Sequence, residues 1–381
     1  MTLGEAVLEA YINANILIVV AYGLWCGARL VLKSAGLPHS YATQLKLLNA
    51  VFLTVVCAPF LVPLFQFLQQ QGLANEINLN LSDIVVSYYL SGGIEMKATE
   101  FESLLQLRHT FTGNVVSGTG LVAQCAIAIF VTGVLIGAVR LFYSMFCLHR
   151  IVRNSYAWRR FGCIHVRLSD RTLVPFSTRG WRNYYVVIPS HMLVQSDALK
   201  VSLAHELQHI RQGDLEWEVT LEALKPFFFL NPAYHAWKRR VEDLRELSCD
   251  GEVLARGRVN ARRYCDTLLS VCQTALRRDR AFVIAVPKVT LVTADRSSFR
   301  DGRISQLEHR ITTLLEARRI RHPKLVYAAV VLPLVTAIVL TALAIQRPAD
   351  WSQDRLTLST VVNLERLDEI NRLSTFGRLR N

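Results

Sequence analysis

The stretch Ala204-His205-Glu206-Leu207-Gln208-His209-Ile210-Arg211 lies near the middle of the 381-residue chain and contains the pattern HExxH. Residues four apart lie on one face of a helix, so His205 and His209 can bind one zinc ion there. Glu206 lies beside them, where it can take a proton from a water that the metal has activated. This stretch therefore predicts the catalytic helix of a zinc hydrolase, with zinc as the cofactor.

A hydrolytic zinc site needs a third protein ligand and one open position for water. The next predicted helix along the chain offers Glu246, and Asp250 follows one turn later on the same face. Such an aspartate commonly accepts the second ring N–H of a ligand histidine and fixes its orientation. Glu242, Asp243 and Cys249 stay open as alternative ligands. Glu242 and Asp243 lie on the same predicted helix, Glu242 on the face of Glu246, and a cysteine sulfur also binds zinc.

Two short strands are expected upstream, at Thr172–Phe176 and Tyr184–Ile188, where β-branched and aromatic residues gather. The second could pair with an extended substrate. The HExxH helix is predicted to start near Asp197 as its N-cap and to end at about Gly213. Asn231-Pro232 then interrupts the helical pattern. The helix that follows should bury Trp237, Val241, Leu244 and Leu247.

Four apolar stretches place the chain among membrane proteins, because a helix needs about 20 apolar residues to cross a bilayer. The hydrophobic content of 51% and the positive mean hydropathy agree. The first stretch follows acidic residues and lacks the positive region of a cleavable signal peptide, so we expect it to stay as an anchor. The predicted spans are residues 12–32, 47–68, 121–141 and 325–345.

Basic residues set the expected orientation, since Lys and Arg are retained on the cytosolic side of a bacterial inner membrane. Residues 150–324 hold about 31 basic and 18 acidic side chains, which accounts for the net charge of +13. We therefore expect a membrane region in residues 1–148 and a cytosolic domain in residues 149–324. The loop 69–118, which is mainly acidic, and the tail 346–381 should lie outside, as should both termini.

The expected partners follow from this arrangement. A basic cytosolic domain beside a membrane is explained by attraction to anionic lipids, and no nucleic-acid recognition motif is present. None of the eight cysteines lies in the predicted exported loop or tail, which indicates reduced thiols and no disulfide framework outside. We expect a lipid bilayer and a protein substrate as partners and no direct nucleic-acid binding, with the oligomeric state open.

The tail contains apolar residues at helical spacing with charges between them, which predicts an amphipathic helix. It is expected either to pack against the loop 69–118 or to lie on the outer membrane surface. A sharper alternative is that it docks a partner or that loop and so reports a stimulus. Its predicted apolar residues are Val361, Leu364, Leu367, Ile370 and Leu373.

These motifs resemble the BlaR/MecR-type antirepressor family of membrane zinc metallopeptidases. The resemblance covers about Val166–Leu254 by motif and the whole chain by its order of three spans, zinc domain and one span. The matching residues are Ala204 to Arg211 with Asp214, Asn231-Pro232, Glu246 to Asp250, Pro175-Phe176 and Val187-Ile188-Pro189.

The resemblance implies a gluzincin: His205, His209 and Glu246 as zinc ligands and Glu206 as acid and base. It also implies a mainly α membrane protein with an α+β zincin-like cytosolic domain between the third and fourth spans. The expected substrate is a cytosolic regulator, such as a transcriptional repressor. One departure is that only about 35 residues follow the last span and they contain no SxxK motif, so acylation by β-lactams is not expected.

Regulatory members of that family cut themselves between the zinc domain and the last span. Residues 295–302 form a polar, turn-rich segment in that interval, and the bond between Ser298 and Phe299 is the first candidate for such a cut. An ordinary flexible connector is the alternative.

Two other functions are compatible with parts of the pattern. A membrane-protein quality-control or CAAX-type zinc protease also uses HExxH and a distant glutamate, but about 115 residues separate His209 from the next span here, which is longer than usual for those enzymes. A non-enzymatic receptor with an inactive protease fold is the other alternative. Every catalytic residue type is present, which favours a membrane metallopeptidase of the sensor-transducer type.

Overall fold

The computed structural model describes residues 3–34, 41–70, 81–257, 260–278, 289–290, 308–313, 323–344 and 353–378. In these ranges the chain is mainly helical, with one small sheet. It divides into two compact units, of which the first comprises Met1–Cys26, Ala50–Phe130 and Ala329–Asn381, and the second Gly27–Asn49 and Val131–Ala328. The seven cysteines with described side chains are free thiols.

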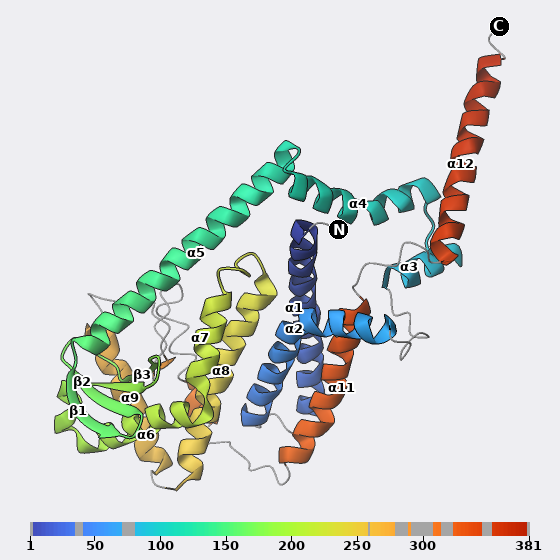
Figure 1. Ribbon diagram of the computed structural model, residues 1–381. Coiled ribbons are helices and arrows are strands. Elements are labelled where there is room, and N and C mark those ends of the chain that lie inside the picture. The colour runs from blue at the N-terminus through green and yellow to red at the C-terminus, as the bar shows by residue number, and fades with distance from the viewer. Residues whose placement is uncertain are drawn as a thin grey trace. The chain divides into compact units, whose positions relative to one another are not determined.

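Three long helices dominate the N-terminal half: α1 (Leu3–Ser34), α2 (Tyr41–Gln70) and α5 (Leu121–Arg153) (Figure 1). Each contains a segment long and apolar enough to cross a membrane, namely Ala10–Ser34, Tyr41–Ala58 and Leu121–Arg153. Nearer the C-terminus, α11 (Pro323–Ala344) covers the fourth predicted span, with a shorter apolar segment at Ala328–Ala344. The first three spans thus coincide with candidate membrane helices, and the fourth stays a prediction.

The sheet has the strand order β1-β2-β4-β3-β5. Strands β2 and β4 are parallel, and the other neighbouring pairs are antiparallel. The strands are β1 (Tyr156–Phe161), β2 (Ile164–Ser169), β3 (Phe176–Arg179), β4 (Tyr184–Pro189) and β5 (Val289–Thr290).

Two strand predictions need correction. The strand predicted at Thr172–Phe176 is wrong in position, since β3 starts only at Phe176; Pro175 has no N–H to donate to a ladder. The strand predicted at Tyr184–Ile188 is confirmed as β4, but it lies between β2 and β3. Both of its edges are therefore occupied, and it cannot take up a substrate strand as expected.

The HExxH segment lies on α6 (Ser196–Gln212), which follows the short helix η1 (Ser190–Val194). The predicted N-cap is wrong: Gln195 occupies that position without a side-chain cap, and Asp197 lies in the first turn, where its charge favours the helix dipole. Three further helices follow, α7 (Asp214–Leu224), α8 (Pro232–Ala255) and α9 (Ala261–Arg278).

Helix α8 starts where the sequence predicts, because Asn231 caps it by accepting from the backbone N–H groups of Ala233 and Tyr234 at 3.0 and 3.3 Å. Pro232 then occupies the first helical position. The predicted apolar face is confirmed, since Trp237, Val241, Leu244 and Leu247 are all buried.

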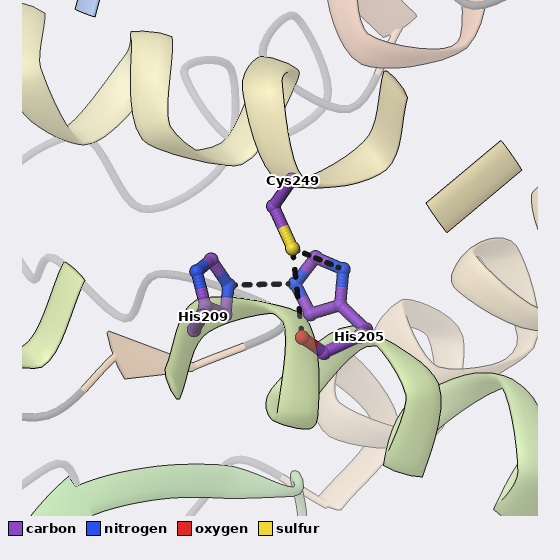
Figure 2. A group of neighbouring side chains, drawn as sticks. All are labelled: His205, His209 and Cys249. Carbon is purple, nitrogen blue, oxygen red and sulfur yellow. Dashed lines mark hydrogen bonds between the residues drawn. The ribbon is translucent and has the colours of Figure 1, made fainter. Parts of the chain in front are cut away.

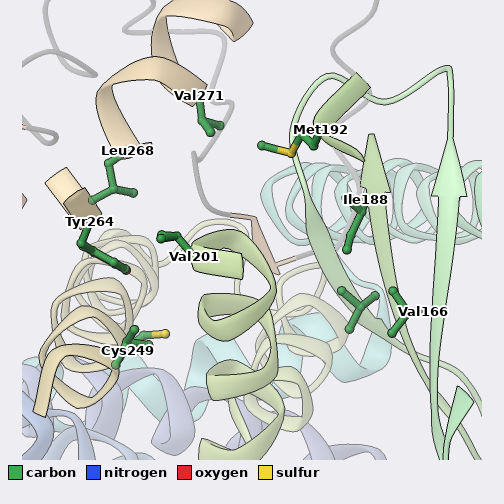
Figure 3. Close-up of a cluster of buried hydrophobic side chains, with 10 residues drawn as sticks. Val166, Ile188, Met192, Val201, Cys249, Tyr264, Leu268 and Val271 are labelled. Atoms are coloured by element: carbon green, nitrogen blue, oxygen red, sulfur yellow. The ribbon is translucent and has the colours of Figure 1, made fainter. Parts of the chain in front are cut away.

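The core of the part of the chain that carries the HExxH helix lies between the sheet and the helices. Alternation along β4 points Val186 and Ile188 to one face and Val187 to the other. The first face packs with Val201 of α6 and with residues of α8 and α9, so that α6 lies between the sheet and α9 (Figure 3). The second face packs against the end of α5 through Leu148 and Val152. Helix α6, with the HExxH segment, is thus enclosed between the sheet and α8 and α9.

A separate cluster joins the tail to the loop of residues 69–118, which contains α3 (Leu81–Leu90) and α4 (Ala98–Ser117). Helix α12 (Gln353–Arg378) packs on both of these helices. Packing of the tail against the loop is therefore confirmed. The shared core consists of Val86, Ala98, Phe101, Leu358 and Val362.

The apolar face expected from the spacing is not the face that packs on the loop, however. Leu364, Leu367 and Ile370 are 55–61% exposed, whereas the packed face carries Leu358 and Val362, and the side chain of Leu373 lies outside the described part. Glu365 contributes to the packed side, where it accepts the backbone N–H of Thr99 at 3.0 Å.

Candidate metal centre

His205 and His209 lie on one face of α6 and are completely buried. Their Nε2 atoms are 3.0 Å apart (Figure 2). The other ring nitrogen of His209, Nδ1, lies 2.7 Å from Asp214 Oδ2 and can donate its proton to that carboxylate. This tautomer leaves Nε2 of His209 with a lone pair for a metal.

The Nδ1 atom of His205 lies 2.8 Å from the hydroxyl of Tyr264, on α9. That hydroxyl donates to Asp250 Oδ1 at 2.5 Å, so it is free to accept a proton from His205 Nδ1. Asp250 itself lies 3.3 Å from the same nitrogen. The structure therefore places Asp250 beside His205, as the sequence suggests, but with Tyr264 as the closer partner. Nε2 of His205 again keeps its lone pair.

Glu246, on α8, faces both histidines. Its Oε2 is 3.5 Å from His205 Nε2 and its Oε1 is 3.7 Å from His209 Nε2. The side chain is buried, and Oε2 makes no hydrogen bond to any part of the chain that the structure describes. These three groups form a small set of converging donor atoms that fits a metal ion.

Cys249 is the competing third donor, since its sulfur and the two imidazoles offer ligand atoms within 4.8 Å of one another. Its Sγ lies 3.5 Å from both Nδ1 and the backbone carbonyl oxygen of His205 (Figure 2). It therefore approaches the side of the ring that Tyr264 occupies, whereas Glu246 faces the Nε2 atoms. Burial raises the pKa of the Cys249 thiol to about 12, which disfavours the thiolate as long as no metal is bound. The geometry of the Nε2 atoms therefore favours Glu246 as the third donor.

Glu206 is fully buried next to His205. Burial raises the pKa of its carboxyl to about 7, although His205 and Ser177 of β3 act in the opposite direction. Its two oxygens and the Ser177 hydroxyl lack a partner of hydrogen-bond geometry among the described residues. A carboxyl with such a pKa can both accept and return a proton near neutral pH.

Charge provides an independent test of whether a metal fits. Glu246 and Asp250 are both buried and share one buried guanidinium, that of Arg310. Their two carboxylates exceed it by one negative charge, and Glu206, buried beside His205, adds another whenever it is deprotonated. Such an excess is costly inside a protein unless it is balanced. A divalent cation between the two Nε2 atoms would balance it, so the residues present fit such an ion.

Comparison with known families gives an independent result. The sequence matches the family described as BlaR1 peptidase M56 over residues 7–291, about three quarters of the chain. The chain belongs to this family. The matched M56 region runs from α1 through the HExxH helix to the end of β5, and so includes all three candidate membrane helices and the buried histidines. Comparison with individually curated proteins yields no match.

Three residues around the histidines of this M56 member received no role at the site from the sequence: Asp214, which counted only toward the resemblance, Tyr264 and Arg310. Asp214 follows Gly213, whose φ of 73° ends α6 in a left-handed turn that suits glycine and brings the next side chain back to His209. That Gly-Asp pair five residues after the motif is a usable signal. Tyr264 and Arg310 come from distant segments without a recognisable spacing.

The proposed self-processing bond, between Ser298 and Phe299, lies outside the described residues. Upstream of it, β5 pairs with β3, matching Val289 with Ser177 and Thr290 with Phe176. Both β3 and β5 contact α6. Val289 and Thr290, the described residues nearest this bond on its N-terminal side, therefore lie at the edge of the sheet beside α6.

Proposed function

We propose that this M56 member is a membrane-bound zinc endopeptidase of the sensor-transducer type, which hydrolyses peptide bonds in a cytosolic regulator such as a transcriptional repressor. The observation that carries the proposal is the convergence of Glu246 on the Nε2 atoms of His205 and His209, with Glu206 beside them. A zinc ion bound there would supply a Lewis acid that polarises a carbonyl and lowers the pKa of water.

The side chains of the centre have separate roles in this proposal. His205, His209 and Glu246 hold the ion, and the contacts of their imidazoles with Tyr264 and Asp214 keep each Nε2 directed toward it. Glu206 takes a proton from the attacking water and gives it to the leaving amine. Burial of Glu206 favours this cycle, because a pKa of about 7 makes both directions of transfer accessible.

The location is part of the proposal. We place the metallopeptidase domain in the cytosol of a bacterium, attached to the inner membrane by four spans, with the loop 69–118 and the tail outside. The charge distribution supports this placement, as do the three apolar helices. In that orientation the contact of α12 with α3 and α4 would form an external module suited to receive a stimulus.

Self-processing between Ser298 and Phe299 is proposed as a regulatory step of the same site. The pairing of β5 with β3 supports this step. β5 lies beside α6, and its last residue, Thr290, is only eight residues before Ser298 in the sequence. An extended segment added to a sheet edge is a common way for peptidases to hold a substrate.

The proposed chemistry is tested with the full-length protein purified in detergent. We expect about one zinc per chain in the wild type and in Glu206→Gln, and loss of zinc in His205→Ala. Cells that produce the wild type should contain new protein N-termini that are missing with Glu206→Gln. Glu252→Gln, an exposed change on α8, is the matched control and should behave as wild type. Full cleavage by Glu206→Gln would rule out the mechanism.

A further inference from the structure

Arg310 brings a guanidinium group to the metal centre from residues 308–313, 60 positions beyond Asp250. The side chain is 7% exposed. Its Nε donates to Asp250 Oδ2 and its Nη2 donates to Asp250 Oδ1, both at 2.7 Å. Its Nη1 lies 3.2 Å from Glu246 Oε2. One cation thus contacts two acidic residues of α8 at once.

The two contacts differ in kind. Arg310 and Asp250 form two parallel hydrogen bonds, the bidentate arrangement of a guanidinium with a carboxylate. This arrangement fixes the relative orientation of the two groups as well as stabilising them. The contact with Glu246 is an ion pair without hydrogen-bond geometry, because Glu246 Oε2 stays unsatisfied. Arg310 therefore fixes Asp250 firmly and leaves the carboxylate of Glu246 available to a metal.

Asp250 passes this constraint on to a histidine. It is fully buried, and its Oδ1 accepts from Tyr264, whose oxygen contacts His205 Nδ1. Without Arg310 the Asp250 carboxylate would lose both hydrogen bonds that fix its plane, and a buried charge without its partner tends to move toward another one. Such a movement would disturb the acceptor of Tyr264 and, with it, the ring of His205.

We propose that Arg310 is a positioning residue of the metal centre, which fixes Asp250, and through Tyr264 the ring of His205, while its remaining nitrogen holds Glu246 toward the histidines. This rests on the proposed function, since it takes His205 and Glu246 as ligands. It also attaches residues 308–313, which lie beyond α9 in the sequence, to the centre.

The test measures zinc affinity in the detergent-purified full chain by competition with a chelator. We expect Arg310→Met and Asp250→Asn each to weaken binding about 10- to 100-fold, the usual cost of removing a partner that orients a ligand. The double variant should bind no more weakly than the weaker single variant, because both changes break one chain of contacts. Arg310→Lys should be intermediate, since an ammonium cannot form the bidentate arrangement. Glu308→Gln, exposed on the same segment, is the control and should match the wild type.

Melting of the metal-free variants separates positioning from folding. Arg310→Met should melt below the wild type, because Asp250 is left unpaired, and the double variant should recover part of that loss. Zinc affinity should nevertheless stay low in the recovered, folded double variant. Wild-type zinc affinity in Arg310→Met would overturn the proposal. So would a double variant whose loss of zinc affinity equals the product of the two single losses, because independent effects would then be acting. A wild-type protein that binds no zinc would instead overturn the proposed function itself.

Discussion

At the scale of single residues, hydrogen bonds to the Nδ1 atoms fix the two histidines of the centre. Tyr264 bonds to Nδ1 of His205 and Asp214 to Nδ1 of His209. Each imidazole is thereby held in the tautomer that leaves Nε2 available for a metal. This arrangement explains why both rings can be fully buried without losing hydrogen bonds.

Asp214→Asn is expected to weaken zinc binding about 10- to 100-fold, because an amide can present its N–H₂ group to His209 Nδ1 and no longer favours the required tautomer. Chelator competition measures the change. Glu252→Gln again serves as the control. An unchanged affinity would show that His209 does not need this partner.

The identity of the third ligand is decided by a pair of variants. Glu246→Gln should lose zinc, and Cys249→Ser should keep it, since the Cys249 sulfur lies toward Nδ1 and the backbone of His205. Cobalt substitution adds a direct reading, because a thiolate ligand gives an intense near-ultraviolet charge-transfer band and a carboxylate does not. A strong band that disappears in Cys249→Ser would favour the histidine-histidine-cysteine set.

At the scale of elements, buried ion pairs join α7 to α8. Arg245 lies 2.7 Å from Glu218, and Lys238 lies 2.8 Å from Glu222. Lys238 also pairs with Glu242 on its own helix. Because Arg245 and Glu246 are neighbours on α8, this network helps to hold the helix that carries the proposed third ligand.

Arg245→Met should lower the free energy of unfolding by about 3–5 kcal/mol, because it leaves Glu218 buried without its main partner. Adding Glu218→Gln should restore part of the loss. Thermal unfolding of the detergent-solubilised, metal-free protein provides the measurement. Equal melting of wild type and Arg245→Met would contradict the structural importance of the pair.

The same network predicts a dependence on pH. Burial raises the pKa of Glu218, but Arg245 and Lys238 lower it by more, so it lies below the ordinary 4.5. Its stabilising contribution is therefore complete above about pH 4.5 and is lost as the pH falls through the lower, folded-state pKa. Glu218→Gln should melt lower at neutral pH and show a weaker decline on the acid side.

At the scale of the whole molecule, the tail and the loop 69–118 form a small core of their own. Val362→Asp should destabilise it by several kcal/mol, because an unpaired charge would be buried at a position that is 1% exposed. Leu364→Asp, at a position that is 61% exposed, is the matched control with little expected effect. Hydrogen exchange in α3 and α4 measures the difference, and equal protection in both variants would show that α12 does not stabilise them.

The proposed topology can be read by cysteine labelling in intact cells. In a variant without reactive native thiols, a cysteine at the exposed position Leu104 should react with a membrane-impermeant reagent. A cysteine at the exposed position Arg256, in the basic domain, should react only after the cells are opened. Labelling of Arg256→Cys in intact cells would reverse the orientation that the positive charges predict.

The sequence by itself determined the features that depend on local spacing. Length and apolarity predict α1, α2 and α5, because crossing a bilayer requires a continuous apolar run. The four-residue spacing puts His205 and His209 on one helical face, and Asn231-Pro232 marks the start of α8 through capping. The family was also accessible from the sequence, because the motifs from Val166 to Leu254 resemble it and the matched region includes them.

Only the tertiary structure decided which distant side chains complete the centre and which faces pack. Tyr264 and Arg310 reach His205 and Asp250 from far along the chain, and no periodicity encodes such contacts. The tail illustrates the same limit: helical spacing predicts a face with Leu364, yet Leu358 and Val362 are buried. Spacing fixes the direction of a side chain relative to its own helix axis, whereas its partner depends on how separate elements pack, a non-local choice made by burial and charge pairing across the whole domain.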